Sequence, residues 1–196
     1  MTTVTGHKAA LILIDFQNDY FPNGRMPLEK STEACQKGLE LLLAFREKDL
    51  PVIHIQHKST RPDAMHLLPC TKGVEFHPDM QPLKTETVIK KNYPNAFRDT
   101  NLQSYLNKNK ITHLVIAGMM THMCIDASVR AAYDSGFTCT VIHDACATKN
   151  LEFNSMLIPA QSVHHAFLSA LQPLYANVIS TKDFLQLQGV RTAVTA

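Results

Sequence analysis

A carboxylate, an amine and a thiol each follow a short apolar run in this sequence, and together they could perform nucleophilic catalysis. Asp15 comes directly after AALILI, Lys91 follows TVIK, and Cys124 comes shortly after THLVIAG. A thiolate is a strong nucleophile, a nearby ammonium lowers the pKa of the thiol, and a carboxylate can accept the thiol proton. The set predicts attack on an amide-type carbonyl, a thioester intermediate and its hydrolysis by water that the same carboxylate activates.

The stretch GMMTHMC, residues 118–124, lies where an expected strand should pass into a helix. The free N–H groups at the start of a helix stabilise negative charge. The backbone N–H groups of Met120 and Cys124 are therefore the natural donors for the oxyanion that forms during attack on a carbonyl. We expect this one turn to hold both the nucleophile and its oxyanion donors.

Six short apolar or β-branched runs are the expected strands, and helical patterns separate most of them. This alternation predicts a three-layer α/β fold with helices on both faces of a parallel sheet, for which we take the Rossmann-like strand order 3-2-1-4-5-6. Ligands bind beyond the carboxyl ends of such strands where the order reverses, so we expect Asp15 and Cys124 to face one crevice. The expected strands are 9–15, 51–57, 87–90, 112–118, 137–143 and 176–180, and the expected helices are 31–48, 100–109, 124–135, 159–171 and 181–187.

Residues 58–86 break the alternation of strands and helices. They hold no convincing periodic segment and are rich in Pro, His and Asp. In a compact domain such a connection is typical of a functional loop or lid. We expect this loop, together with residues 149–158, to cover the site.

The composition favours a single domain, residues 1–196, that acts on a small molecule. The chain has 196 residues, and 45% of them are hydrophobic, which suffices for one substantial core. The 19 basic and 17 acidic side chains are interspersed, so neither a nucleic acid nor a membrane is an expected partner. The apolar run near the N-terminus is too short for a signal peptide, and five cysteines, an odd number, favour reduced thiols in the cytoplasm.

The motifs LILIDFQNDYF, VIKKNYPNAF and AGMMTHMCIDASVRAAYDSGF resemble those of the isochorismatase-like cysteine hydrolase superfamily. The resemblance implies a catalytic triad of Asp15, Lys91 and Cys124, with Lys91 chosen over Lys90 because six positions separate it from Phe97. It also implies a non-proline cis peptide bond four residues before the nucleophile, between residues 119 and 120. Family members commonly assemble into homo-oligomers, so a dimer or tetramer is expected.

The histidines argue against a bound metal, and no cofactor is expected. Metal-dependent nicotinamidases of this superfamily carry an Asp-x-His pair after the second strand, whereas this chain reads HIQHKSTRPD. His54 and His57 are three apart on an expected strand, which places them on opposite faces of the sheet. The resemblance therefore favours the metal-independent branch, in which His57 and His77 match common positions, and nicotinamide is not the favoured substrate.

Two alternatives to a thiol-dependent amide hydrolase stay open. Isochorismatase-type hydrolysis of a vinyl ether would use Asp15 as a general acid and leave Cys124 idle, and a non-catalytic interaction module could retain the same fold. Under either catalytic reading, residues near the triad in sequence are expected to form an apolar substrate pocket with a few polar groups. These residues are Gln17, Tyr20, Phe21, Phe97 and Met119.

Overall fold

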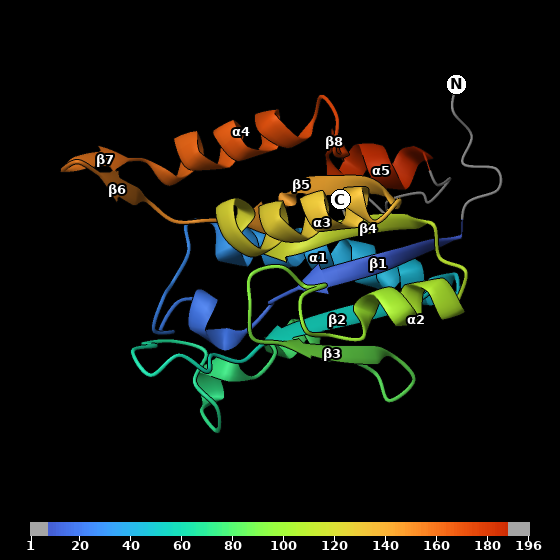
Figure 1. Cartoon of the computed structure of the whole chain (residues 1–196), viewed down its shortest axis with the longest axis horizontal. Helices are drawn as coiled ribbons and strands as arrows, with labels where there is room; N and C mark the ends of the chain where they lie inside the picture. The colour runs from blue at the N-terminus through green and yellow to red at the C-terminus, as the bar shows by residue number, and fades with distance from the viewer. Residues whose placement is uncertain (1–7, 188–196) are drawn as a thin grey trace, which may run out of the picture.

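The centre of the molecule is a six-stranded parallel sheet (Figure 1). The computed structural model describes residues 8–187, so both ends of the predicted single domain, residues 1–7 and 188–196, lie outside the described residues. The strand order is β3-β2-β1-β4-β5-β8, which confirms the predicted order because β8 is the sixth strand of the sheet. The strands are β1 (Ala9–Ile14), β2 (Val52–His57), β3 (Thr87–Lys91), β4 (His113–Met119), β5 (Thr138–Ala147) and β8 (Asn177–Ile179).

Helices cover both faces of the sheet, as the alternating pattern predicts. On β1, Leu11 and Leu13 face the cluster that holds α1 and α5, while Ile12 and Ile14 face the cluster that holds α2 and α3. Apolar side chains at every position of a strand are what two covered faces require. No helix among residues 8–187 is long and apolar enough to cross a membrane. The helices are α1 (Ser31–Glu47), α2 (Leu102–Lys108), α3 (Asp126–Asp134), α4 (Ala160–Leu171) and α5 (Thr181–Leu187).

The structure adds several elements that the sequence patterns do not predict. The strands β6 (Leu151–Phe153) and β7 (Met156–Ile158) form an antiparallel hairpin, which extends away from the sheet beyond α4 (Figure 1). Within the long 58–86 connection lie two single-turn helices, η2 (Lys72–Val74) and η3 (Pro78–Met80). Another, η1 (Asn18–Tyr20), follows β1. These elements are too short to show a helical or alternating pattern in the sequence.

Gly118 allows β4 to approach β1 at the point where the site begins. A Cβ atom at this position would lie 1.9 Å from the carbonyl oxygen of Ile14, and the φ angle of Gly118 is +139°. Only glycine avoids both the collision and the strained backbone conformation. The chain can therefore bring the end of β4 against the residue that precedes Asp15.

Candidate active site

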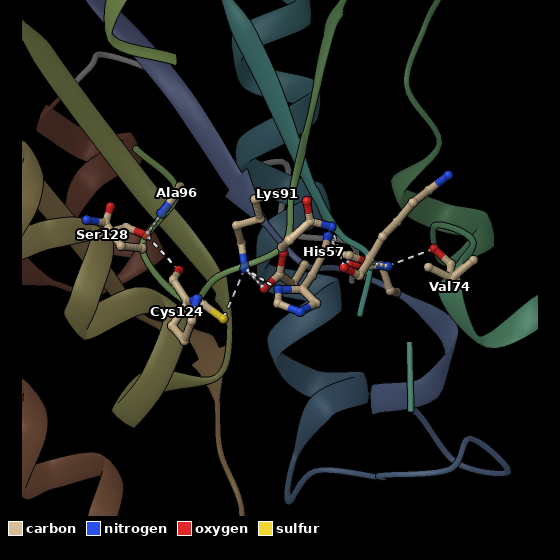
Figure 2. A network of polar contacts seen from close by, with 12 residues as sticks. His57, Val74, Lys91, Ala96, Cys124 and Ser128 are labelled. Carbon is tan, nitrogen blue, oxygen red and sulfur yellow. Dashed lines mark hydrogen bonds and ion pairs between the residues drawn. The ribbon is translucent and has the colours of Figure 1, made fainter. Parts of the chain in front are cut away.

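Lys91 contacts both other members of the predicted triad, and Figure 2 shows it beside Cys124. Its Nζ donates to Asp15 Oδ2 at 2.7 Å and to Cys124 Sγ at 3.1 Å. The two segments that carry Asp15 and Cys124 follow β1 and β4, which are neighbours at the point where the strand order reverses. The two side chains are therefore joined through one ammonium, and the crevice in front of them stays a prediction.

The backbone positions Asp15 in a turn rather than in a continued strand. Asp15 has a φ angle of +56°, in the left-handed region that few non-glycine residues adopt. Its N–H donates to Ile55 O at 3.0 Å, and its carbonyl accepts from the Gln17 N–H at 2.8 Å. Such a conformation persists only where the surrounding structure determines it, and it concentrates at functional sites.

Cys124 lies within a π-helical turn, η4 (Thr121–Ile125), rather than at the first position of the α-helix as expected. The peptide bond between Met119 and Met120 is cis. The carbonyl of Met120 accepts from the N–H groups of Met123 and Ile125, at 3.0 and 3.2 Å. The turn therefore holds the thiol just before α3 begins.

Ser128 connects the segment after Lys91 to the helix that follows the nucleophile. Its Oγ accepts from the Ala96 N–H at 3.0 Å and donates to Pro94 O at 3.4 Å (Figure 2). Because Ser128 is buried, these contacts satisfy polar groups that water does not reach. Sequence reasoning did not identify Ser128, since a serine in a helix gives no signal of a distant backbone partner.

Lys91 lowers the pKa of the Cys124 thiol, as expected, but it does not decide the net direction. Burial and then the negative charge of Asp15 raise the pKa, Lys91 only partly opposes them, and the resulting pKa is about 12. The resting thiol is therefore protonated, and deprotonation requires an acceptor in contact with it. Asp15 Oδ1 is buried and has no hydrogen-bond partner among residues 8–187, which leaves it available as that acceptor.

Lys91 keeps its charge despite complete burial. Burial lowers the pKa of this ammonium, but Asp15 and Cys124 outweigh that effect, and the pKa is raised above its ordinary value. A buried ammonium needs such partners because an unpaired charge is strongly disfavoured away from water. The charge that faces the thiol is therefore permanent at neutral pH.

His57 is a third neighbour of Lys91, and the predicted triad leaves it out. Its Nδ1 lies 3.0 Å from Lys91 Nζ (Figure 2), and in the parallel sheet His57 and Lys91 are paired residues of β2 and β3. Burial and the charge of Lys91 lower the pKa of His57 to about 4, so the imidazole is neutral and accepts from the ammonium. The sequence signal that could have identified His57 is its position directly before the long 58–86 loop.

His54 lies on the opposite face of the sheet from His57, as predicted. Its Nε2 lies 2.9 Å from Glu86 Oε2, and Arg46 of α1 binds both oxygens of the same carboxylate. Burial alone raises the pKa of Glu86, but Arg46, the Leu83 N–H and His54 outweigh it and lower the pKa to about 2. His54 is thus part of a structural ion-pair network.

By distance alone, Asp15, His57 and Cys124 could hold a metal ion, since their donor atoms lie within 4.8 Å of one another. The ammonium of Lys91, however, contacts all three residues at 2.7 to 3.1 Å. A cation placed among these donors would meet a fixed positive charge. With Lys91 in this position, the residues present do not fit a metal.

Among the predicted substrate contacts, the structure brings Tyr20 to the triad. Tyr20 is buried, and burial together with the charges of Cys124 and Asp15 raises the pKa of its hydroxyl. Gln17, by contrast, uses its side-chain amide on the backbone: it donates to His57 O and Val74 O and accepts from the His57 N–H. Gln17 therefore fixes the 58–86 connection to the end of β2.

The other three predicted contacts lie in different surroundings. Met119 is completely buried in the core. The ring centroid of Phe97 lies 6.0 Å from that of Phe137, on the face covered by α2 and α3. Phe21 packs on His77, with ring centroids 4.1 Å apart. The role of these three residues in substrate binding stays a prediction.

Asp19 holds the predicted lid loop in place. Its Oδ2 accepts from the buried Leu67 N–H at 2.6 Å, and its Oδ1 accepts from the Arg25 N–H at 3.1 Å. A Cβ atom on Gly73 would lie 2.1 Å from Asp19 Oδ1, so this approach requires glycine. The loop thereby brings the His66 ring to 5.9 Å from the ring of Tyr20.

The three side chains of the triad are almost completely buried. Asp15, Lys91 and Cys124 are at most 4% exposed. A cavity of about 530 Å³ lies elsewhere, bordered by the first turns of α1, the end of β5 and the start of α4, and no triad residue lines it.

This chain is similar in sequence to the members of a known protein family. The model of the isochorismatase domain matches residues 9–183. The chain belongs to the isochorismatase family. The uncharacterized isochorismatase family protein YddQ of Bacillus subtilis is 46% identical over 177 residues, which cover 90% of this chain and 98% of YddQ.

Two further proteins are similar to this chain in structure or in sequence. A crystal structure from Oleispira antarctica, assigned to the isochorismatase hydrolases, is 46% identical with a TM-score of 0.88, and the match covers 95% of this chain and 99% of that one. The maleamate amidohydrolase of Pseudomonas putida is 26% identical over 195 residues, which cover 92% of this chain and 87% of that protein. One relative of this chain is thus named for amide hydrolysis.

Proposed function

We propose that this isochorismatase-family protein is a metal-independent cysteine hydrolase that cleaves an amide-type C–N bond of a small molecule. The observation that carries the proposal is the single ammonium of Lys91, which contacts both Asp15 and Cys124 in a buried site. Similarity to a protein named maleamate amidohydrolase supports the bond type. The arrangement supplies a nucleophile, a proton acceptor and a fixed positive charge.

The reaction begins when Asp15 takes the thiol proton and Cys124 Sγ attacks the carbonyl carbon. The backbone N–H groups of Met120 and Cys124 stabilise the oxyanion, and Lys91 stabilises the sulfur while it carries negative charge. The C–N bond breaks, and the departing amine takes the proton from Asp15, which leaves an acyl group on sulfur. Water then loses a proton to Asp15 and attacks the thioester, which releases the acid and restores the thiol.

Substrate binding in this proposal uses the loop that Asp19 holds over Tyr20. Because the triad is buried, a substrate reaches Cys124 only when part of the 58–86 loop moves. Tyr20 then forms one wall of the pocket. The proposal needs no cofactor, and it places a homo-oligomer of this chain in the cytoplasm.

The decisive experiment is a screen of small amides for ammonia or amine release, with Cys124→Ala as the matched control. For the amide that turns over, we expect the variant to lose at least about 10³-fold in kcat/KM, because no other group can form the thioester. If no amide turns over, or if Cys124→Ala retains turnover, the thiol mechanism is wrong. Retained hydrolysis of a vinyl ether by the variant would favour Asp15 acting as a general acid instead.

A further inference from the structure

A second set of metal-ligating side chains lies outside the triad, between α1 and the end of the 58–86 loop. Cys35 comes from the first turns of α1, His77 directly precedes η3, and Asp79 lies within η3. Cys35 Sγ is 3.5 Å from His77 Nδ1, and His77 Nδ1 is 3.7 Å from Asp79 Oδ2. We propose that these three residues form a binding site for a zinc-type divalent cation.

The separations between the donor atoms suit a tetrahedral ion. Zinc binds cysteine sulfur at about 2.3 Å, imidazole nitrogen at about 2.0–2.1 Å and carboxylate oxygen at about 2.0–2.2 Å. In a tetrahedron with these bond lengths, neighbouring donors are about 3.4–3.6 Å apart. The observed 3.5 and 3.7 Å are close to those values, and all three donors lie within 4.8 Å of one another.

The protonation of His77 also suits metal binding. The backbone N–H of Asp79 donates to His77 Nδ1 at 3.3 Å, and an N–H can only donate, so Nδ1 carries the lone pair that a metal requires. The contacts of this nitrogen with the Asp79 N–H and the Cys35 thiol are both long. An ion would replace them, and the thiol proton would leave to solvent as the metal–sulfur bond forms.

The site differs from the triad in what surrounds its donors. Among residues 8–187, neither Cys35 nor His77 hydrogen-bonds to a lysine or an arginine, whereas an ammonium contacts every donor of the triad cluster. A thiolate and a carboxylate together balance a divalent charge, and the soft sulfur favours zinc over magnesium or calcium.

Burial gives the site a closed end and an open end. Cys35 is 2% exposed, the side chain of His77 is 23% exposed, and that of Asp79 is 59% exposed. Phe21 covers the His77 ring. An ion can therefore enter from the side of Asp79 and keep a water molecule as its fourth ligand. The backbone N–H of His77 donates to Phe16 O at 2.9 Å. A bound ion would therefore connect α1 to Phe16, the residue that follows Asp15.

Zinc titration of the Cys124→Ser protein tests the proposal, because this background removes the active-site thiol. In competition with a chromophoric chelator, we expect about one Zn²⁺ per chain, and we expect Cys35→Ser to weaken binding by more than about tenfold. Asp79→Asn, at an exposed position, should also weaken it. Cys70→Ser is the matched control, because Cys70 is an exposed thiol outside the cluster and its loss should change nothing.

Cobalt provides a spectroscopic readout that a purely structural role of Cys35 would not produce. Co²⁺ bound in the Cys124→Ser protein should show a thiolate-to-cobalt charge-transfer absorption, which should vanish on Cys35→Ser. Circular dichroism and thermal melts without metal verify that the variants fold. Absence of stoichiometric Zn²⁺ binding would overturn the proposal, as would binding and absorption that survive both Cys35→Ser and Asp79→Asn.

Discussion

Replacement of Asp15 by asparagine should abolish hydrolysis and yet make Cys124 easier to deprotonate. The carboxylate raises the pKa of the thiol, and one of its oxygens lies within 4.8 Å of Cys124 Sγ. At this upper limit of 4.8 Å and an effective dielectric constant of about 20, the repulsion between carboxylate and thiolate is about 3.5 kcal/mol. The thiolate fraction at a given pH below the thiol pKa should therefore rise about 300-fold.

The direction of the pKa change of Cys124 in Asp15→Asn follows from the positive charge of Lys91, which remains in the variant. In the variant, the buried ammonium of Lys91 loses its partner at 2.7 Å, and a thiolate at 3.1 Å becomes the group that can neutralise it. The same loss should lower the free energy of unfolding by about 3–5 kcal/mol, since one partner of a buried ion pair is removed. Catalysis fails in spite of the lower thiol pKa, because no group accepts the proton or activates water.

Alkylation by iodoacetamide as a function of pH measures this effect. Mass spectrometry of the Cys124 peptide gives its alkylation rate, and the exposed Cys70 in the same sample is the internal reference. The midpoint pH for Cys124 should fall in Asp15→Asn and rise in Lys91→Met, because the two variants remove opposite charges. A midpoint that stays constant or rises in Asp15→Asn would refute this account of the site.

Three further outcomes follow from the geometry. Gly118→Ala should unfold the protein or lower its free energy of unfolding by more than about 3 kcal/mol. Gly136 also has a positive φ angle, but a Cβ atom there would meet nothing within 4 Å, so Gly136→Ala should lower the free energy of unfolding by only about 1 kcal/mol. Similar melting temperatures for the two variants would contradict the argument. Glu86 has a pKa of about 2, below its ordinary value of 4.5, so its stabilisation is complete above about pH 5 and is lost as the pH falls toward 2. Urea unfolding should therefore show Glu86→Gln less stable than the wild type at pH 7 and equal to it near pH 2, and a gap that persists at pH 2 would count against this role. His57 has a pKa of about 4, so kcat/KM should not decline near pH 6.5 and should decline only as the pH falls through about 4. A decline near pH 6.5 that disappears in His57→Gln would show that the imidazole is not held neutral.

The strands of the sheet and the reactive residues near their ends could be predicted because both depend on short-range pattern. Apolar runs such as that of β1 mark buried parallel strands, and the residue that follows each strand lies at one edge of the sheet. Asp15, Lys91 and Cys124 are identified by that rule together with the family resemblance. The hairpin β6–β7 could not be found in this way, because two three-residue strands carry no measurable alternation.

What the sequence by itself determined is therefore which side chains meet at the carboxyl edge of the sheet. What only the tertiary structure decided is their electrostatic state. Burial raises the pKa of Cys124 to about 12 and lowers that of His57 to about 4, and neither value follows from residue type. Desolvation and charge act through distances between atoms on separate segments, and those distances exist only once the chain is folded. Cys35 and His77 are 42 positions apart in the chain, and folding likewise brings them together with Asp79.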